Sequence, residues 1–162
     1  MSEHPASAAS PPAWTADRAR ITGSAPYEAT AGYARAVRVG SFVYVAGTTG
    51  LGDDGRVVPG GAYAQAQRAF AIVVGALARA GAAPADVVRT RMYVTDAAHS
   101  GDVTRAHAEV FGAVRPAATL VVVAGLIDPA MLVEVEADAV LGGAPPPADG
   151  ADAARPWQAG TP

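Results

Sequence analysis

The sequence contains no cysteine and no lysine, and aromatic residues make up only 6% of its 162 residues. Without cysteine the chain has no disulfide framework, no thiolate metal site and no thiol nucleophile. Without lysine it lacks the Schiff-base residue of pyridoxal-phosphate enzymes and the phosphate-binding residue of a Walker A loop. Any reaction must therefore use hydroxyl, carboxylate, imidazole or guanidinium groups, the backbone or water.

The charge balance is mildly acidic, with 12 arginines against 15 acidic residues and a net charge of −3. This balance gives no electrostatic reason to expect a nucleic-acid partner. No apolar run reaches the ~18 residues of a membrane span, and the first twenty residues lack the pattern of a signal peptide. We therefore expect a soluble, cytoplasmic protein that binds neither nucleic acid nor membrane.

The composition along the chain predicts a single domain between two flexible tails. Residues 1–20 and 142–162 are rich in alanine, proline and small polar residues and show no apolar period. Such segments bury too little apolar surface to offset the entropy that is lost when they become ordered. We therefore expect the folded unit to span 21–141, a length that supports a hydrophobic core of its own.

Apolar periodicity predicts an α+β fold. Helices are predicted where apolar residues recur at helical spacing, over 62–80 and from Ser100 or Asp102 to about Phe111. β-rich or alternating segments predict strands at 33–39, 42–46, 57–58, 87–95, 119–124 and 132–141. Such an order is typical of a mixed sheet with two helices on one face. The other face is partly apolar, so we expect it to be buried in a symmetric oligomer.

Six segments, taken in order, resemble the RidA/YjgF family over about 31–141. They read AGYARAVRVGSFVYVAGTTG at 31–50, ALARAG at 76–81, DVVRTRMYVTD at 86–96, AHAEVFG at 106–112, RPAATLVVV at 115–123 and LVEVEADAV at 132–140. The resemblance implies a chorismate-mutase-like fold, in which three subunits pack their sheets into a central barrel with clefts at the subunit interfaces. It also implies hydrolysis of enamines and imines, such as 2-aminoacrylate, to keto acids and ammonia, without a metal or an organic cofactor.

The resemblance also implies which residues line the cleft. Glu134 matches the glutamate that positions the attacking water, and Tyr33 matches the tyrosine of the family's Gly-Pro-Tyr segment. Gly47 and Thr48 fall in the cleft segment that reads Ser-Gly-Gln in the family. The predicted catalytic residues are therefore Glu134, Tyr33 and Thr48, whereas Gly47 and the backbone of Thr119 are predicted to bind the substrate.

Ala118 departs from the family pattern. Deaminating members read Pro-Ala-Arg-Ser where this chain reads Pro-Ala-Ala-Thr at 116–119, and the missing arginine is the one that grips the substrate carboxylate. An arginine fork is the natural anchor for an imine derived from an amino acid. We therefore expect Ala118 to lie at the substrate-binding position and the substrate to differ from 2-aminoacrylate. Arg105, Arg115 and Arg91 are the candidates to replace the missing guanidinium.

The chemistry of the residues themselves points to the same groups. Hydrolysis of an imine needs a water near the electrophilic carbon, an acceptor for its proton and donors for the developing charge. Glu134 supplies an acceptor, and the hydroxyls of Tyr33 and Thr48 supply donors beside the backbone of Gly47. The same equipment suits enamine–imine or keto–enol tautomerisation, and the sequence does not separate the two reactions.

Two non-catalytic alternatives stay open at this point. The acidic residues of the last strand share one face and suit ion pairs with the arginines of the strand at 87–95. These residues are Glu134, Glu136 and Asp138 on one side and Arg89 and Arg91 on the other. The second alternative is a trimer that binds a metabolite or a protein without catalysis, which the loss of the arginine at position 118 favours.

The pair His107 and Glu109 resembles the His-x-Glu motif of zinc deaminases. That motif needs a pair of cysteines to complete its metal site. Since the chain has no cysteine and its three histidines are scattered, the sequence predicts no metal and no other cofactor.

Overall fold

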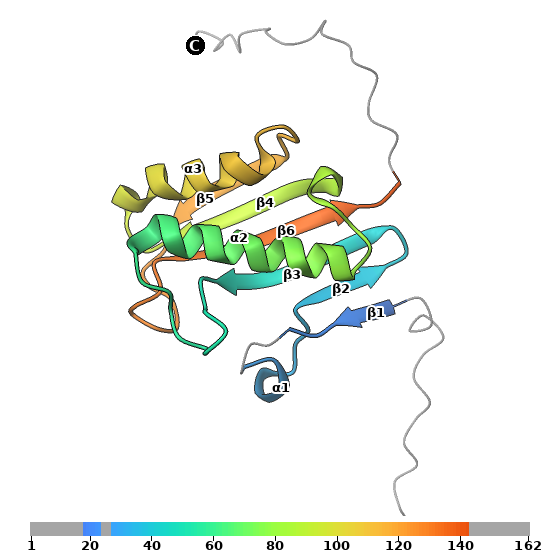
Figure 1. Cartoon of the computed structure of the whole chain (residues 1–162), viewed down its shortest axis with the longest axis horizontal. Helices are drawn as coiled ribbons and strands as arrows, with labels where there is room; N and C mark the ends of the chain where they lie inside the picture. The colour runs from blue at the N-terminus through green and yellow to red at the C-terminus, as the bar shows by residue number, and fades with distance from the viewer. Residues whose placement is uncertain (1–17, 24–26, 143–162) are drawn as a thin grey trace, which may run out of the picture.

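The computed structural model describes residues 18–23 and 27–142 (Figure 1). Most of both predicted tails lies in 1–17 and 143–162, outside the described residues. The predicted start of the folded unit at residue 21 is corrected by the strand β1, which covers Arg18–Ile21. These residues are ordered because their backbone pairs antiparallel with β2, Ala36–Val39.

The described residues form one mixed sheet with the strand order β1-β2-β3-β6-β4-β5. β4 and β5 run parallel, and the other neighbouring strands are antiparallel. The remaining strands are β3 (Phe42–Thr49), β4 (Val87–Val94), β5 (Ala117–Val122) and β6 (Val133–Val140). β6 is therefore central, between β3 and β4, which places its residues next to both halves of the sheet.

Two long helices, α2 (Gly61–Arg79) and α3 (Ser100–Phe111), cover one face of this sheet (Figure 1). A five-residue helix, α1 (Tyr27–Ala31), precedes β2, and short 3-10 turns at Pro84–Asp86 and Ala97–His99 precede β4 and α3. The α+β class with two helices on one face is thus confirmed. None of the described helices is long and apolar enough to cross a membrane.

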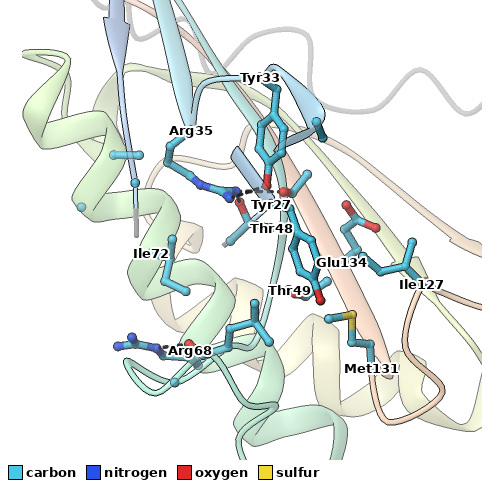
Figure 2. Close-up of a pocket in the computed structure, with 18 of the residues that line it drawn as sticks. Tyr27, Tyr33, Arg35, Thr48, Thr49, Arg68, Ile72, Ile127, Met131 and Glu134 are labelled. Atoms are coloured by element: carbon cyan, nitrogen blue, oxygen red, sulfur yellow. Dashed lines mark hydrogen bonds between the residues drawn. The ribbon is translucent and has the colours of Figure 1, made fainter. Parts of the chain in front are cut away.

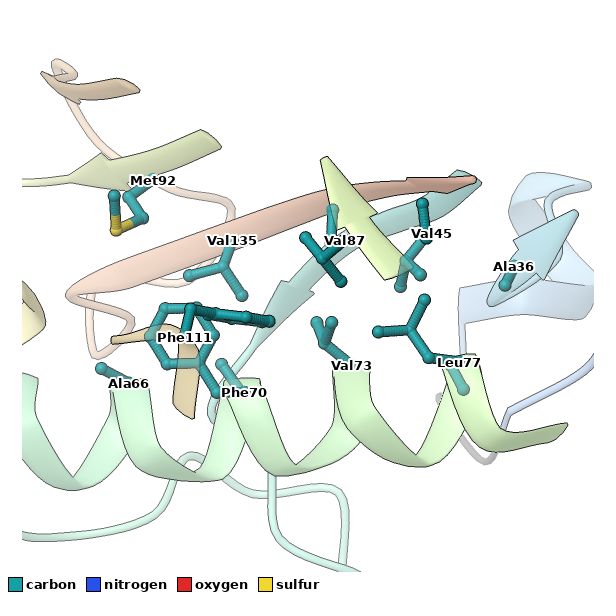
Figure 3. Packing of buried hydrophobic residues seen from close by; sticks show 14 of the residues in the cluster. Ala36, Val45, Ala66, Phe70, Val73, Leu77, Val87, Met92, Phe111 and Val135 are labelled. Carbon is teal, nitrogen blue, oxygen red and sulfur yellow. The ribbon is translucent and has the colours of Figure 1, made fainter. Parts of the chain in front are cut away.

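The hydrophobic core fills the space between α2, α3 and the inner face of the sheet (Figure 3). Phe70 of α2 meets Phe111 of α3 edge to face, with ring centroids 5.8 Å apart. Four alanines also lie buried on the inner side of α2, namely Ala62, Ala66, Ala69 and Ala76. Because alanine adds little bulk, the small and large side chains together can fill the layer at close packing. The alanine-rich composition is therefore part of the core as well as of the tails.

The segment before β2 differs from the predicted strand at 33–39. The backbone N–H groups of Gly32 and Tyr33 both donate to the carbonyl of Glu28, at 3.1 Å each. These bonds close the end of α1, and Gly32 takes the left-handed backbone conformation that ends helices. The strand consequently begins at Ala36, and Tyr33 lies in the turn that leads into it.

β3 is longer than the predicted strand at 42–46 and is irregular. Its register against β6 shifts between Val45 and Thr48, and pairing then continues to Thr49. Such a bulge bends a strand and redirects its side chains. The predicted short strand at 57–58 is reduced to a single bridge between Leu51 and Val57.

The outer face of the sheet carries both charges and exposed rings. Arg91 lies between two carboxylates of β6, 3.3 Å from Glu136 and 3.2 Å from Asp138. The cross-strand ion pairs predicted for these two acids are therefore present. Beside them, Phe42 and Tyr44 of β3 are 52% and 50% exposed.

Candidate active site

A cavity of about 600 Å³ opens between α2, the bulged end of β3, the start of β6 and the segment around α1 (Figure 2). Most of the surface that lines it is apolar, and several polar side chains converge on it. The principal apolar residues are Tyr27, Leu51, Ile72, Ala76, Ile127 and Met131. The principal polar ones are Tyr33, Arg35, Thr48, Arg68, Arg79 and Glu134. An apolar pocket with a few converging polar groups is typical of a small-molecule site.

Glu134 is the carboxylate of this cavity. It is half-buried, and within the described residues its carboxylate makes no hydrogen bond or ion pair. Burial and the nearby charge of Glu136 raise the pKa of Glu134, while the positive charge of Arg35 opposes the rise. A half-buried carboxylate that the fold leaves unpaired is free to bind a water or a substrate proton.

Gly47 lies directly against this carboxylate. A Cβ atom at position 47 would lie 2.0 Å from Oε1 of Glu134, and real Cβ contacts are essentially never shorter than 3.0 Å. The bulge in β3 brings the backbone of Gly47 to this place, between the paired positions Val45 and Thr48. Only glycine therefore allows the backbone and the carboxylate to approach each other this closely.

Arg35 forms the polar floor of the cavity, and sequence reasoning missed it. The residue is 6% exposed, and its Nε donates to Oε1 of Glu28 at 3.3 Å. Its Nη1 donates to the carbonyl of Gly47 at 2.9 Å and to Oγ1 of Thr48 at 2.7 Å. The available signal was a charged residue that directly precedes the apolar strand at 36–39 and so has to find partners when that strand is buried.

Tyr33 and Thr48 both receive a hydrogen bond from Arg35, but they differ in what remains free. Nη2 of Arg35 donates to the Tyr33 hydroxyl at 3.3 Å (Figure 2), so the hydroxyl proton of Tyr33 can be donated to a ligand. The Thr48 hydroxyl already donates to the carbonyl of Ala46 at 2.7 Å, and the residue is 2% exposed. Thr48 therefore holds Arg35 in place, whereas the Tyr33 hydroxyl keeps a proton that it can donate into the cavity.

Comparisons with known proteins agree with this architecture. The family model described as endoribonuclease L-PSP matches residues 22–141. The chain belongs to this family, the YjgF/RidA family. An uncharacterized protein of Streptomyces coelicolor is 44% identical over 126 residues, which are 76% of this chain and 92% of the relative. A RutC family protein of Pyrococcus abyssi is 32% identical over 106 residues, which are 65% and 83% of the two chains.

Solved structures of the YjgF/RidA family share the fold. A member of the YjgF/YER057c/UK114 family from Mycobacterium tuberculosis is 46% identical, with a TM-score of 0.69 over 76% of this chain and 99% of that one. The YjgF gene product of Escherichia coli is 27% identical, with a TM-score of 0.68 over 76% and 99%. The family resemblance of the sequence is thus confirmed.

The predicted site residues divide into two groups in this family member. Tyr33, Gly47, Thr48 and Glu134 all line the cavity. The other four predicted residues do not line it in the described part of a single chain. Ala118 and Thr119 lie on β5, at the edge of the sheet opposite β1. Arg105 and Arg115 lie on α3 and in the loop that follows it.

Arg105 has local partners on the helix surface. Its guanidinium carbon lies 3.7 Å from the centroid of the Tyr63 ring, and its Nη2 is 3.4 Å from Oδ1 of Asp102. Tyr63 in turn donates to Glu109 at 2.7 Å. Within one chain, Arg105 is thus part of a surface cluster between α2 and α3.

His107 and Glu109 do not form a metal site. No group of three or more potential metal ligands occurs among the described residues. His107 packs between Phe70 and Phe111, and its Nε2 lies 2.9 Å from Oγ1 of Thr90. Burial lowers the pKa of His107. It is therefore a half-buried histidine that packs against the aromatic core, where burial favours its neutral form.

Proposed function

We propose that this member of the YjgF/RidA family hydrolyses an enamine or imine in the cavity beside Glu134. The observation that carries the proposal is the unpaired, half-buried carboxylate of Glu134 next to the backbone of Gly47. A carboxylate with a raised pKa is a stronger base than an ordinary glutamate and is suited to taking a proton from water. The proposed reaction uses water as its second substrate and needs no cofactor.

The first half of the reaction adds water to the imine. The water oxygen forms a bond to the imine carbon, and the electron pair of the C=N double bond moves to nitrogen. Glu134 accepts a proton from the water, and Tyr33 donates its hydroxyl proton to the nitrogen. The product of this step is a neutral carbinolamine, with Glu134 protonated and Tyr33 deprotonated.

The second half expels ammonia. Glu134 returns its proton to the nitrogen, the C–N bond breaks, and ammonia leaves with the bonding electron pair. The carbinolamine hydroxyl gives its proton to Tyr33 as the carbonyl forms. Both side chains are restored, and the net reaction converts one imine and one water into one carbonyl compound and one ammonia. An enamine substrate first becomes the imine by gaining a proton at carbon and losing one at nitrogen.

We further propose that three copies assemble into a trimer through the outer face of the sheet. Phe42 and Tyr44, both half-exposed, belong to this face. Burying them against another subunit would remove apolar surface from water. The β5 edge with Ala118 and Thr119, or Arg115 before it, would then be placed to meet the cavity of a neighbouring subunit. Light scattering should give a mass near 49 kDa, three times the chain's 16.2 kDa, and a clean monomer contradicts the assembly.

The test of the activity generates imines in place. An L-amino acid oxidase acting on leucine supplies 4-methyl-2-iminopentanoate, and an amine oxidase acting on 3-methylbutylamine supplies the neutral 3-methylbutanimine. We expect the protein to accelerate ammonia release from at least one of them over buffer. Glu134→Gln should lower the rate about 100-fold or more. Glu109→Gln is the matched control, because its carboxylate bonds Tyr63 and Gln67 on the helix surface.

Two results would argue against hydrolysis. No acceleration with either imine contradicts the proposal. Exchange of substrate hydrogen for deuterium without ammonia release would show a tautomerase that uses the same carboxylate. RNA cleavage, which the family description names, is disfavoured because the net charge is −3 and Glu134 would repel a phosphate. A single-stranded RNA incubated with the protein should therefore remain intact.

A further inference from the structure

We propose that the substrate of this cavity is a neutral, apolar imine without a carboxylate, because the cavity's buried guanidinium is charge-compensated and its carboxylate is not. That the substrate is an imine rests on the proposed function. The preference for an uncharged ligand rests on the site alone. Three features carry it: the partners of Arg35, the surroundings of the other arginines, and the walls around Glu134.

Arg35 has neither the charge nor the donors to anchor a carboxylate. Its partner Glu28 lies 3.3 Å away, and the two side chains are 7% and 9% exposed, so the pair is buried and neutral as a unit. Four of its five N–H groups donate to Glu28, Gly47, Thr48 and Tyr33. Recognition of a carboxylate by arginine typically uses two parallel N–H groups. Among the described contacts only one N–H of Nη2 is left, which suits a single neutral acceptor.

Glu28 is itself held in place. Its Oε2 accepts a hydrogen bond from the backbone N–H of Gly23 at 2.6 Å. A Cβ at position 23 would lie 2.3 Å from Oε1 of Glu28. Glycine at position 23 and the helix α1 therefore fix the compensating carboxylate beside Arg35, so the pairing is built into the fold.

Within one chain, the other two arginines that line the cavity lie on its α2 side and bind loops. Nε of Arg68 donates to the carbonyl of Leu51 at 2.7 Å, and its Nη2 pairs with Asp53. Arg79 is exposed and donates to the carbonyl of Thr22. Their contacts join α2 to the surrounding loops, and water screens the charge of an exposed guanidinium.

The opposite side of the cavity repels anions. Glu134, Ile127 and Met131 lie together there, facing the side that holds Arg35 and Ile72 (Figure 2). An anionic substrate would have to approach the unpaired carboxylate among apolar walls, where charge repulsion is weakly screened. A neutral imine with a branched or aromatic group meets the apolar walls, the Tyr33 proton and the Glu134 carboxylate without this repulsion.

The first test measures binding and does not depend on catalysis. The probes are 3-methylbutanamide and 3-methylbutanoate, which have the same shape and differ in charge. Titrations of the full-length protein followed by NMR should give an affinity for the amide at least about tenfold higher than for the acid at neutral pH. Equal affinities, or tighter binding of the acid, overturn the proposal. An acid preference that disappears in Arg79→Gln or in Arg115→Gln would assign the anchor to the arginine that was replaced.

The second test removes the carboxylate that balances the charge of Arg35. Glu28→Gln leaves the Arg35 charge without its partner, so the preference for the amide should fall at least about tenfold or reverse. The double variant Glu28→Gln with Arg35→Gln is again neutral, and it should retain the preference even if both ligands bind more weakly. Glu109→Gln is the control for loss of a carboxylate elsewhere. Because Glu28→Gln leaves the charge of Arg35 buried and unpaired, the melting temperature of this variant is measured first. If Glu28→Gln unfolds, the double variant provides the comparison.

The activity assay separates this inference from the proposed function. If both hold, 3-methylbutanimine is hydrolysed with a kcat/KM at least about tenfold above that of 4-methyl-2-iminopentanoate. An amide preference in binding without any acceleration refutes the hydrolase and keeps the inference about ligand charge. Acceleration of the acidic imine above the neutral one refutes the charge inference and keeps the hydrolase.

Discussion

The contact between Gly47 and Glu134 makes the sharpest prediction, because a single methyl group should displace the carboxylate that we propose to be catalytic. In Gly47→Ala the new Cβ would lie 2.0 Å from Oε1 of Glu134, and a tolerable contact is at least 3.0 Å. The carboxylate must therefore retreat by about 1 Å, and a displacement of that size costs about 100-fold in rate when a group has to meet a reacting atom. Gly47 has no left-handed backbone, so alanine imposes no backbone strain.

The expected result is a loss of kcat/KM with little loss of stability. Because the Glu134 side chain is only half-buried, it can turn toward the open cavity, and the melting temperature should change by no more than a few degrees. Gly101→Ala is the matched control, since it has open space around the added methyl and lies on α3. It should keep full activity and gain about 0.5–1 kcal/mol of stability.

The assay is imine hydrolysis by purified protein, with the melting temperature measured in parallel. Shortening the carboxylate arm in Gly47→Ala/Glu134→Asp should recover part of the lost rate, because the aspartate withdraws its oxygens from the added methyl. Full activity of Gly47→Ala would refute the reasoning. So would a loss of activity that is accounted for by unfolding.

Three further predictions concern ionisation and packing. The acidic limb of the kcat/KM profile should lie above the ordinary pKa of a glutamate, and Glu136→Gln should move it to lower pH by removing a charge that raises the pKa of Glu134; an unmoved limb would contradict this. Because burial lowers the pKa of His107, the unfolded chain binds a proton first. Stability should therefore fall as the pH drops below about 6.5 toward the folded pKa. Urea unfolding should show this decline weakened in His107→Gln. Phe70→Ala removes a fully buried ring that meets Phe111; it should cost about 3–5 kcal/mol in the same experiment, and a cost below 1 kcal/mol would refute the packing.

The sheet and the two long helices could be predicted because their signals are local. Phe70, Val73 and Leu77 recur at helical spacing and lie buried in α2, and the alternation of β6 shows directly in its burial pattern. The same alternation separated the inward Val135 from the outward Glu134. The face on which a strand residue lies can therefore be predicted from sequence, whereas the family resemblance distinguished Glu134 from Glu136 and Asp138 as a site residue.

The bulge in β3 and the close approach of Gly47 to Glu134 could not be predicted from the sequence. A run such as Phe42 to Thr49 has the composition of one strand, and no residue type announces that its register will shift between Val45 and Thr48. The shift depends on how β3 meets β6, which is a long-range pairing. Family resemblance marked Gly47 as a cleft residue, but only the folded chain shows that its missing side chain makes room for Glu134.

The sequence did not predict β1 or α1, and for the same reason it did not predict Arg35 as a site residue. Residues 18–20 have the composition of the tail before them, so β1 was assigned to that tail, and the five residues of α1 are too few for a periodic pattern. Unless α1 is predicted, nothing in the sequence places Glu28 near the cavity. Without Glu28, a buried Arg35 would be an uncompensated charge, so the sequence alone favours a surface position for Arg35. Each contact depends on the one before it. The pairing of β1 with β2 positions the start of the domain, α1 places Glu28 beside Arg35, and the charge of Glu28 makes the burial of Arg35 tolerable. The charge of the candidate active site thus depends on a segment that carries no clear structural signal in its own sequence.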